Sequence, residues 1–188
     1  MTMTTSHDEA IDAPAWTIRP ESPVDLDQIH ELHREAFRRP EEPELVDAIR
    51  SGPDFIPELS LVAVADDGSV LGHILLSCVR FQPHEEPAPN MEVLALAPLA
   101  VLPPHAGRGI GSALMREALA IADRREEPFV VVLGSPGFYA RFGFVPAADL
   151  GIDGPYADAG PAFAVRPRPG AEPPPSGTVV YPARFEAV

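Results

Sequence analysis

The sequence predicts a mixed α/β fold with about seven strands and roughly four helices. Apolar stretches typical of strands alternate with stretches of helical periodicity along most of the chain. The clearest case is 99–115, where an apolar segment runs through closely spaced glycines into a helical pattern. With 188 residues and 45% hydrophobic content, the chain suits one folded domain with a single core. We expect this domain to span 15–188, behind a flexible N-terminal tail over 1–14.

A short strand and two helices are expected at the start of the domain. The strand covers 15–19, and apolar residues then recur at helical spacing over 25–37. Pro40 follows this helix closely and ends it. A shorter helix is expected over 44–50, closed by Ser51-Gly52-Pro53.

The next three strands carry the strongest turn and breaker signals. Segments 59–65 and 70–81 flank Asp66-Asp67-Gly68-Ser69, which is typical of a hairpin turn. The fourth strand covers 91–102 and contains Pro98. Proline removes a hydrogen bond of the strand ladder, so we expect a bulge there or splaying of the fourth and fifth strands.

The C-terminal half begins with the main helix, expected over 107–125 with an apolar stripe on one face. The fully apolar segment 129–133 is typical of a buried central strand. A short helix follows over 138–142. Further strands are expected at 144–145, 162–166 and 178–181.

Gly107, Gly109 and Gly111 mark a candidate phosphate site, because they lie where the loop becomes the main helix. Glycine permits a sharp turn and lets a ligand approach the main chain. The first amides of a helix have no partner inside it, and the helix dipole is positive there. Such a turn can hold a phosphate or pyrophosphate without a lysine.

Charge and composition exclude several classes of protein. The formal net charge of −14 disfavours a nucleic-acid partner, which would need clustered Lys and Arg. Cys78 is the only cysteine, so no intrachain disulfide can form. Residues 1–13 lack the apolar core of a signal peptide, and the longest apolar run, 93–104, is too short to span a membrane. We therefore expect a cytoplasmic protein without a membrane partner.

The chain resembles the GNAT superfamily of N-acetyltransferases over roughly residues 16–185. Leu99-Ala-Val-Leu-Pro with Gly107-Arg-Gly-Ile-Gly-Ser112 is similar to the pyrophosphate loop of that family. Val131-Val-Leu-Gly134 with Phe138-Tyr-Ala-Arg-Phe-Gly-Phe144 is similar to its next strand and helix. Val70-Leu-Gly-His-Ile74 and Gly177-Thr-Val-Val-Tyr-Pro182 extend the match.

The resemblance implies an enzyme that moves the acetyl group of acetyl-CoA to a primary amine by direct attack in a ternary complex. The acceptor would be a small molecule or a peptide, and a homodimer is possible. The residues implied in coenzyme binding are Leu99, Ala100, Val101, Ala106, Gly107, Arg108, Gly109, Ile110, Gly111 and Ser112. Ala106 departs from the Gln or Arg usual at its position, and His105 or Arg108 could fill in. Arg38-Arg39 could meet the 3′-phosphate of the coenzyme.

Tyr139 is the candidate general acid, since it matches the family's tyrosine and a phenol can give a proton to a departing thiolate. Its alternative role is to pack the short helix. The candidate base is Glu92, at the start of the fourth strand, where some members carry a glutamate. His73 and His105 are further choices, because histidine titrates near neutral pH.

Other features leave alternatives open. Acidic residues could line the acceptor site and attract a cationic amine, or simply form a solvated surface; they are Glu41, Glu42, Glu44, Glu85 and Glu86. His30 and His33 share a helical face, but no third ligand is evident and no metal is expected. A non-catalytic acyl-CoA-binding or regulatory module is the alternative function. A dinucleotide-binding oxidoreductase fits poorly, because Ser112 stands where its fingerprint needs glycine.

Overall fold

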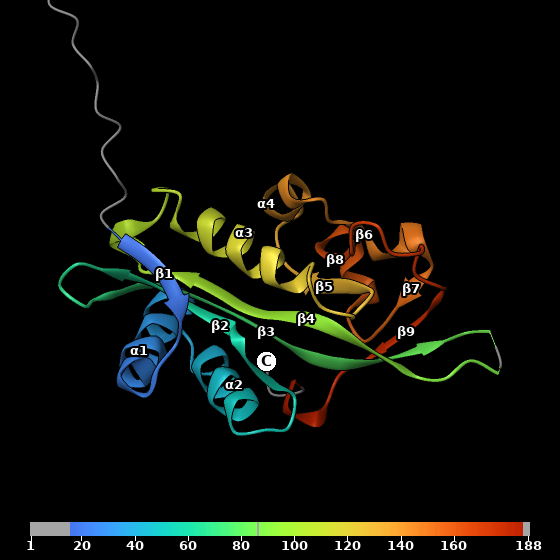
Figure 1. Cartoon of the computed structure of the whole chain (residues 1–188), viewed down its shortest axis with the longest axis horizontal. Helices are drawn as coiled ribbons and strands as arrows, with labels where there is room; N and C mark the ends of the chain where they lie inside the picture. Colours follow the sequence, from blue (N-terminus) through green and yellow to red (C-terminus); the bar gives the residue numbers. More distant parts are fainter. Residues whose placement is uncertain (1–15, 86, 186–188) are drawn as a thin grey trace, which may run out of the picture.

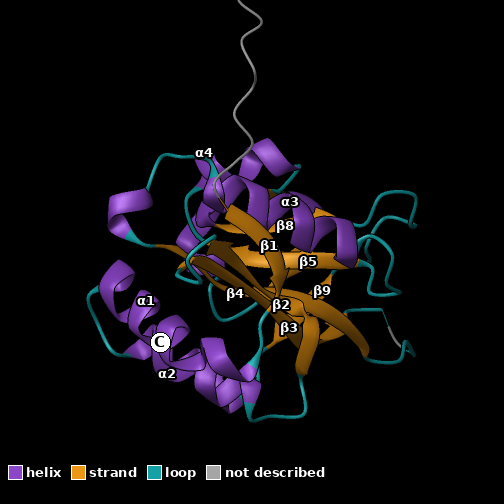
Figure 2. Ribbon diagram, turned by 60° about the vertical axis from the view of Figure 1, so that its left-hand side comes forward, coloured by secondary structure: helices purple, strands orange, loops and turns teal. Residues whose placement is uncertain are grey.

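The computed structural model describes residues 16–85 and 87–185, which form one mixed sheet between two helical layers (Figures 1 and 2). The predicted tail over 1–14 lies outside the described residues. Nine strands occur within the described part, together with four α-helices. The strands are β1 (Trp16–Pro20), β2 (Phe55–Ala65), β3 (Val70–Pro83), β4 (Met91–Val101), β5 (Phe129–Leu133), β6 (Val145–Pro146), β7 (Ile152–Asp153), β8 (Phe163–Pro167) and β9 (Gly177–Val180). The helices are α1 (Leu26–Phe37), α2 (Glu41–Arg50), α3 (Ile110–Ala122) and α4 (Pro136–Tyr139).

The sheet has the order β1-β2-β3-β4-β5-β8-β6, with β9 paired to both β3 and β7. Strands β1 to β4 form an antiparallel meander, and β5 pairs parallel to β4. A parallel neighbour requires a crossover connection, and α3 supplies it between β4 and β5. This crossover places the glycine turn between the end of β4 and the start of α3.

The core consists of two apolar layers, one on each face of the sheet. One layer packs under α1 and α2, and the other packs under α3. Strand β5 shows the alternation, since Val131 faces the first layer while Val130 and Val132 face the second. Burial on both faces explains why this segment is apolar throughout.

The structure confirms the mixed α/β class, and the described residues contain nine strands where about seven were expected. Eight of them overlap a segment predicted as a strand, and β7 does not, because two residues are too short to show alternation. The main helix starts at Ile110 rather than Gly107, since Gly107 and Gly109 have φ of 77° and 86° and cannot continue a right-handed helix.

Helix α2 begins at Glu41, three residues before its predicted start at Glu44. Pro43 lies in the first turn, where a missing N–H removes no helical hydrogen bond. The earlier start matters for the site, because it makes Glu42 part of the helix. With Leu45, Val46 and Ile49, Glu42 forms the buried face of α2.

Candidate functional site

The glycine turn presents unpaired amides at the start of α3. The helical ladder begins with the amide of Ala113, which donates to the oxygen of Gly109 at 3.0 Å. The amides of Ile110, Gly111 and Ser112 precede that ladder, and no side chain caps the helix. This end of the helix dipole is therefore available to an anion.

The turn itself depends on glycine for its backbone angles rather than for space. A Cβ added to Gly107 or Gly109 would meet nothing within 4 Å, yet both residues have positive φ. Ala106 and Arg108 are exposed beside them. The amide of Ala106 donates to the backbone oxygen of Pro103 at 3.2 Å and so caps the short turn Pro103–His105 that precedes the glycines.

Strands β4 and β5 separate next to this turn, as predicted. They pair only from Leu94 to Leu96 on β4, against Val130 to Val132 on β5. Beyond Pro98, the segment Leu99–Val101 stays paired to β3 on one side, and no strand of the described part of the chain pairs with it on the other. This edge offers main-chain groups to an extended ligand, in the manner of an added strand.

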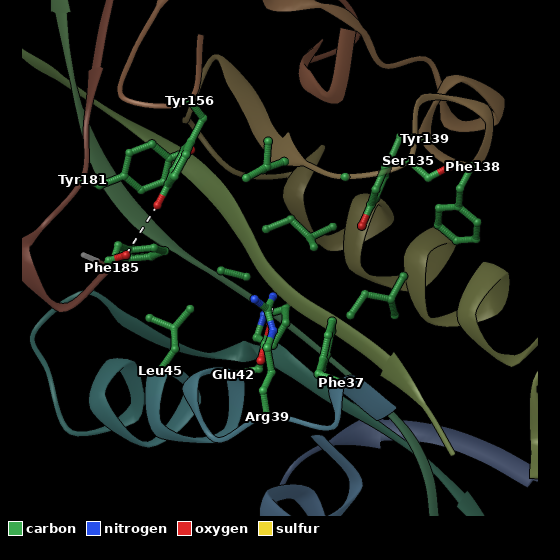
Figure 3. Close-up of a pocket in the computed structure, with 16 residues that line it drawn as sticks. Phe37, Arg39, Glu42, Leu45, Ser135, Phe138, Tyr139, Tyr156, Tyr181 and Phe185 are labelled. Atoms are coloured by element: carbon green, nitrogen blue, oxygen red, sulfur yellow. Dashed lines mark hydrogen bonds and ion pairs between the residues drawn. The ribbon is translucent and has the colours of Figure 1, made fainter. Parts of the chain in front are cut away.

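A cavity of about 530 Å³ opens where the two strands part. Figure 3 shows aromatic and apolar side chains around it, from both sides of the sheet. Leu99 belongs both to this lining and to the open edge of β4. The lining consists of Phe37, Arg39, Glu42, Leu45, Leu96, Ala97, Pro98, Leu99, Leu133, Gly134, Ser135, Phe138, Tyr139, Tyr156, Tyr181 and Phe185.

Tyr139 lies at the end of α4 with its hydroxyl directed into the cavity (Figure 3). Its ring packs edge-on against Phe138 and Phe144, with centroid distances of 5.1 and 5.6 Å. Burial raises the pKa of Tyr139 to about 12, because the charged form would be poorly solvated. The phenol therefore stays protonated at neutral pH and can act as a proton donor.

Glu92 lies apart from this cavity. It is exposed near the beginning of β4, in a depression that it shares with Arg125 and Glu127. Along β4, the paired segment Leu94–Leu96 separates it from Leu99. Its predicted role as base therefore finds no support in the geometry.

The two histidines proposed as alternative bases also lie outside the cavity lining. His105 is half-buried in the turn that precedes the glycines. His73 is fully buried in the layer under α1, and both of its ring nitrogens already have hydrogen-bond partners.

Glu42 is the charged cavity residue that the sequence did not single out from its acidic neighbours. Its side chain is buried, and one carboxylate oxygen pairs with Arg39. The other, Oε2, has no hydrogen-bond partner within residues 16–85 and 87–185. Of the other candidate acids, Glu44 and Glu85 are exposed, Glu41 is half-buried, and Glu86 lies outside the described residues. A helical start at Glu41 would have revealed Glu42, since it then precedes Leu45 by three positions on one face.

A buried polar network joins α1 to the strands beneath it. His33 Nε2 lies 2.8 Å from His73 Nδ1, and His73 Nε2 lies 2.9 Å from Ser60 Oγ and 3.2 Å from Glu21. Arg50 forms two further hydrogen bonds with Glu21, at 2.6 and 3.0 Å. If both histidines are neutral and protonated on Nε2, every one of these contacts has a donor and an acceptor.

The charge state of the network follows from its burial. Burial lowers the pKa of His33 and of His73, because neither imidazolium would be hydrated. For Glu21, burial would raise the pKa, but hydrogen bonds from His73, Arg50 and Ser60 outweigh it and lower the pKa to about 2.

We expect stability to fall in two stages on acidification. All three pKa values are lower in the folded state, so the unfolded chain binds more protons and acid favours unfolding. Loss should begin below about pH 6.5, where the histidines of the unfolded chain become protonated. It should continue between about pH 4.5 and 2, where Glu21 is protonated in the unfolded chain but still charged in the folded protein. Urea unfolding at pH 7.5, 5.5 and 3.5 measures this, and an unchanged midpoint between pH 7.5 and 5.5 would contradict neutral buried histidines.

The described residues contain no group of three or more His, Cys, Asp or Glu side chains placed to hold a metal ion. His30 and His33 do not converge, since His30 is exposed and contacts Asp47 while His33 is buried against His73. Of the described helices, none has the length and apolar character needed to cross a membrane.

Comparisons with known proteins agree with this geometry. The family described as an acetyltransferase (GNAT) domain matches residues 17–147. The uncharacterized N-acetyltransferases YhbS and YjhQ of Escherichia coli K12 are each 36% identical, over 131 and 133 residues. These matches cover 70% of this chain, and 74% and 71% of the two relatives.

Two solved structures share the fold over nearly their whole length. The GNAT-family YhbS of Escherichia coli in complex with CoA has a TM-score of 0.75 and 30% identity, covering 93% of both chains. A GNAT-family acetyltransferase of Brucella melitensis in complex with acetyl-CoA has a TM-score of 0.71 and 34% identity, covering 90% of this chain and 97% of its own. The fold, the glycine turn and the sequence matches agree, and this chain belongs to the GNAT family of acetyltransferases.

Proposed function

We propose that this protein transfers the acetyl group of acetyl-CoA to a primary amine by direct attack in a ternary complex. The observation that carries the proposal is the continuity of three features: the glycine turn, the open edge of β4 at Leu99–Val101 and the cavity that contains Tyr139. The CoA and acetyl-CoA bound by the two structural relatives support acetyl-CoA as donor.

Coenzyme binding would use main-chain groups almost throughout. The amides of Ile110 to Ser112, with the turn from Ala106 to Gly109, would hold the pyrophosphate at the positive end of α3. The pantetheine arm would lie along Leu99–Val101, where β4 lacks a neighbour. That path leads to Leu99, so the thioester would reach the cavity beside Tyr139.

The cavity residues would then assist acyl transfer. The amine nitrogen forms a bond to the acetyl carbon, and the carbon–sulfur bond breaks as the intermediate collapses. Tyr139 would give its phenolic proton to the leaving thiolate, and a proton released by the nitrogen restores the phenol. A main-chain N–H of β4 would stabilise the oxyanion, and holding the two reactants side by side supplies much of the rate.

A thiol-release assay with acetyl-CoA and a panel of amines tests this proposal. The panel should include aromatic and aliphatic amines, polyamines, amino acids and a lysine peptide. We expect release of CoA that depends on an amine, together with a thermal shift on adding acetyl-CoA. Tight coenzyme binding without turnover of any amine would instead favour the non-catalytic acyl-CoA-binding module.

Gly134 lies against the ring of Tyr139, so a side chain at position 134 should affect acetyl transfer. A Cβ at position 134 would lie 2.5 Å from Tyr139 Cε2, which is too close for the ring to stay in place. Gly134→Ala should therefore reduce acetyl transfer by about 10²-fold, the usual cost of a small misplacement. Acetyl-CoA binding should be unchanged in the same variant.

Gly137→Ala is the matched control for this substitution. Gly137 lies in α4 together with Tyr139, but its added Cβ would meet nothing within 4 Å. It should retain wild-type turnover. Equal turnover by both variants would show that the position of the Tyr139 ring does not matter.

A further inference from the structure

The cavity is apolar around an isolated pair of charges. Among the described residues of its lining, Arg39 and Glu42 are the charged ones. Tyr156, Tyr181 and Phe185 form one wall, with ring centroids 5.2 and 5.1 Å apart along the series. An occupant of this space must therefore be largely uncharged and apolar, with one polar group that suits the charged pair.

Within this cavity, no described residue donates a hydrogen bond to one carboxylate oxygen of Glu42. Glu42 is only 3% exposed, and among the described residues its Oε2 has no hydrogen-bond partner, although Oε1 pairs with Arg39. A buried carboxylate oxygen without a donor is costly, so such an atom calls for a specific explanation. Figure 3 shows the Glu42 and Arg39 side chains extending together into the cavity, with Tyr139 across from them.

Resting on the function proposed above, we propose that Glu42 binds the ammonium group of the acceptor through Oε2 and takes its proton. The acceptor is then a primary amine on an uncharged, apolar body, aromatic or aliphatic. The ammonium group supplies the missing donor, and the aromatic wall takes the body. An acceptor with its own carboxylate beside the amine is disfavoured, because Arg39 is already paired with Glu42 and a second carboxylate would face like charge.

The proton balance is complete with these residues. The ammonium gives one proton to Glu42, which leaves a neutral amine and a neutral carboxylic acid in the apolar cavity. The amine nitrogen bonds to the acetyl carbon, the carbon–sulfur bond breaks, and Tyr139 protonates the thiolate. The second nitrogen proton restores Tyr139. Glu42 then releases its proton to solvent, which reaches the charged pair on the side of Arg39, whose side chain is more than half exposed. The products are the amide, the free thiol of CoA and one proton.

Wild-type protein and the variants Glu42→Gln and Glu42→Asp test the proposal with 2-phenylethylamine as acceptor. At pH 7 we expect Glu42→Gln to lower kcat/KM for the amine by about 10²-fold, while acetyl-CoA binding by thermal shift is unchanged. Glu42→Asp should recover part of the loss. The gap between Glu42→Gln and wild type should narrow towards pH 10, because the free amine then no longer needs a base.

Glu44→Gln is the matched control, since Glu44 lies on the same helix but is exposed and outside the cavity lining. Equal activity of the Glu42→Gln and Glu44→Gln variants would overturn the proposal. If the ratio of kcat/KM between wild type and Glu42→Gln does not change with pH, Glu42 does not take the proton. A second measurement uses only the wild type: 2-phenylethylamine should exceed phenylalanine in kcat/KM by at least about tenfold.

The outcomes also separate this inference from the proposed function. If wild type acetylates polyamines, amino acids or peptide lysines but no apolar amine, the acetyltransferase function stands and the role of Glu42 is wrong. If acetyl-CoA binds and no amine of any class is acetylated, the proposed function itself is wrong.

Discussion

Replacing Tyr139 with phenylalanine should lower kcat for amine acetylation by about 10²–10⁴-fold, with acetyl-CoA binding unchanged. The substitution removes only the hydroxyl that points into the cavity. The phenyl ring keeps its edge-on contacts with Phe138 and Phe144, so the fold and the coenzyme site should persist. The loss should appear in kcat rather than in KM, because the proton is needed only as the thiolate leaves.

The alkaline limb of the pH profile gives an independent check on this role. Because burial raises the pKa of Tyr139 to about 12, wild-type activity should not decline from loss of this proton up to pH 10. Steady-state kinetics with saturating amine, from pH 6 to 10, measure this together with the Tyr139→Phe variant.

Tyr156→Phe is the matched removal of a hydroxyl from the same cavity. The Tyr156 hydroxyl donates to the backbone oxygen of Phe185 at 3.4 Å, and its loss should affect kcat far less. Unchanged turnover in Tyr139→Phe would remove Tyr139 from the mechanism and leave it a packing role. Equal losses in both variants would show that neither hydroxyl has a special function.

Replacing Glu21 with alanine should produce the largest loss of stability, about 3–5 kcal/mol in the free energy of unfolding. Its side chain is 7% exposed and accepts hydrogen bonds from Arg50, Ser60 and His73. Arg50 is itself mostly buried, and without Glu21 its Nε and Nη2 lose their carboxylate, while Nη1 keeps only the exposed Asp47. Urea unfolding monitored by circular dichroism measures the change.

Glu31→Ala is the control for this substitution, because Glu31 forms an ion pair with Arg34 on the exposed side of α1. Exposed pairs contribute about 1 kcal/mol or less, so this variant should unfold almost as wild type does. Similar losses in both variants would show that the buried network contributes no more to the free energy of unfolding than an exposed ion pair does. In Glu21→Ala, the second stage of the loss of stability, below about pH 4.5, should disappear, which would assign that stage to Glu21.

The sequence predicted the parts of the site that depend on local backbone chemistry. Gly107 and Gly109 adopt the positive φ that the glycine turn requires, and Pro98 lies where β4 and β5 separate. Tyr139 was also predicted as a site residue, and it faces the cavity (Figure 3). Its role as general acid stays a prediction.

Residues that are distant in sequence could not be assigned in this way. Glu92 was selected by its position at the start of a strand, but it lies with Arg125 and Glu127 at the other end of β4. Glu42 was one acid among five, and only packing of α2 against the sheet buries it. His33 and His73 are 40 positions apart, and nothing local indicates that their rings meet.

Sequence patterns were enough to place most of the elements in order and to find the glycine turn. These follow from backbone angles and from apolar periodicity, which are properties of neighbouring residues. The family was indicated by similarity of motifs and is shown by the sequence matches. Packing in three dimensions sets which charged side chains share the cavity and which are buried. Burial and pairing depend on the elements that pack across the sheet, and so a carboxylate such as Glu42 differs from Glu44 by its surroundings rather than by its sequence.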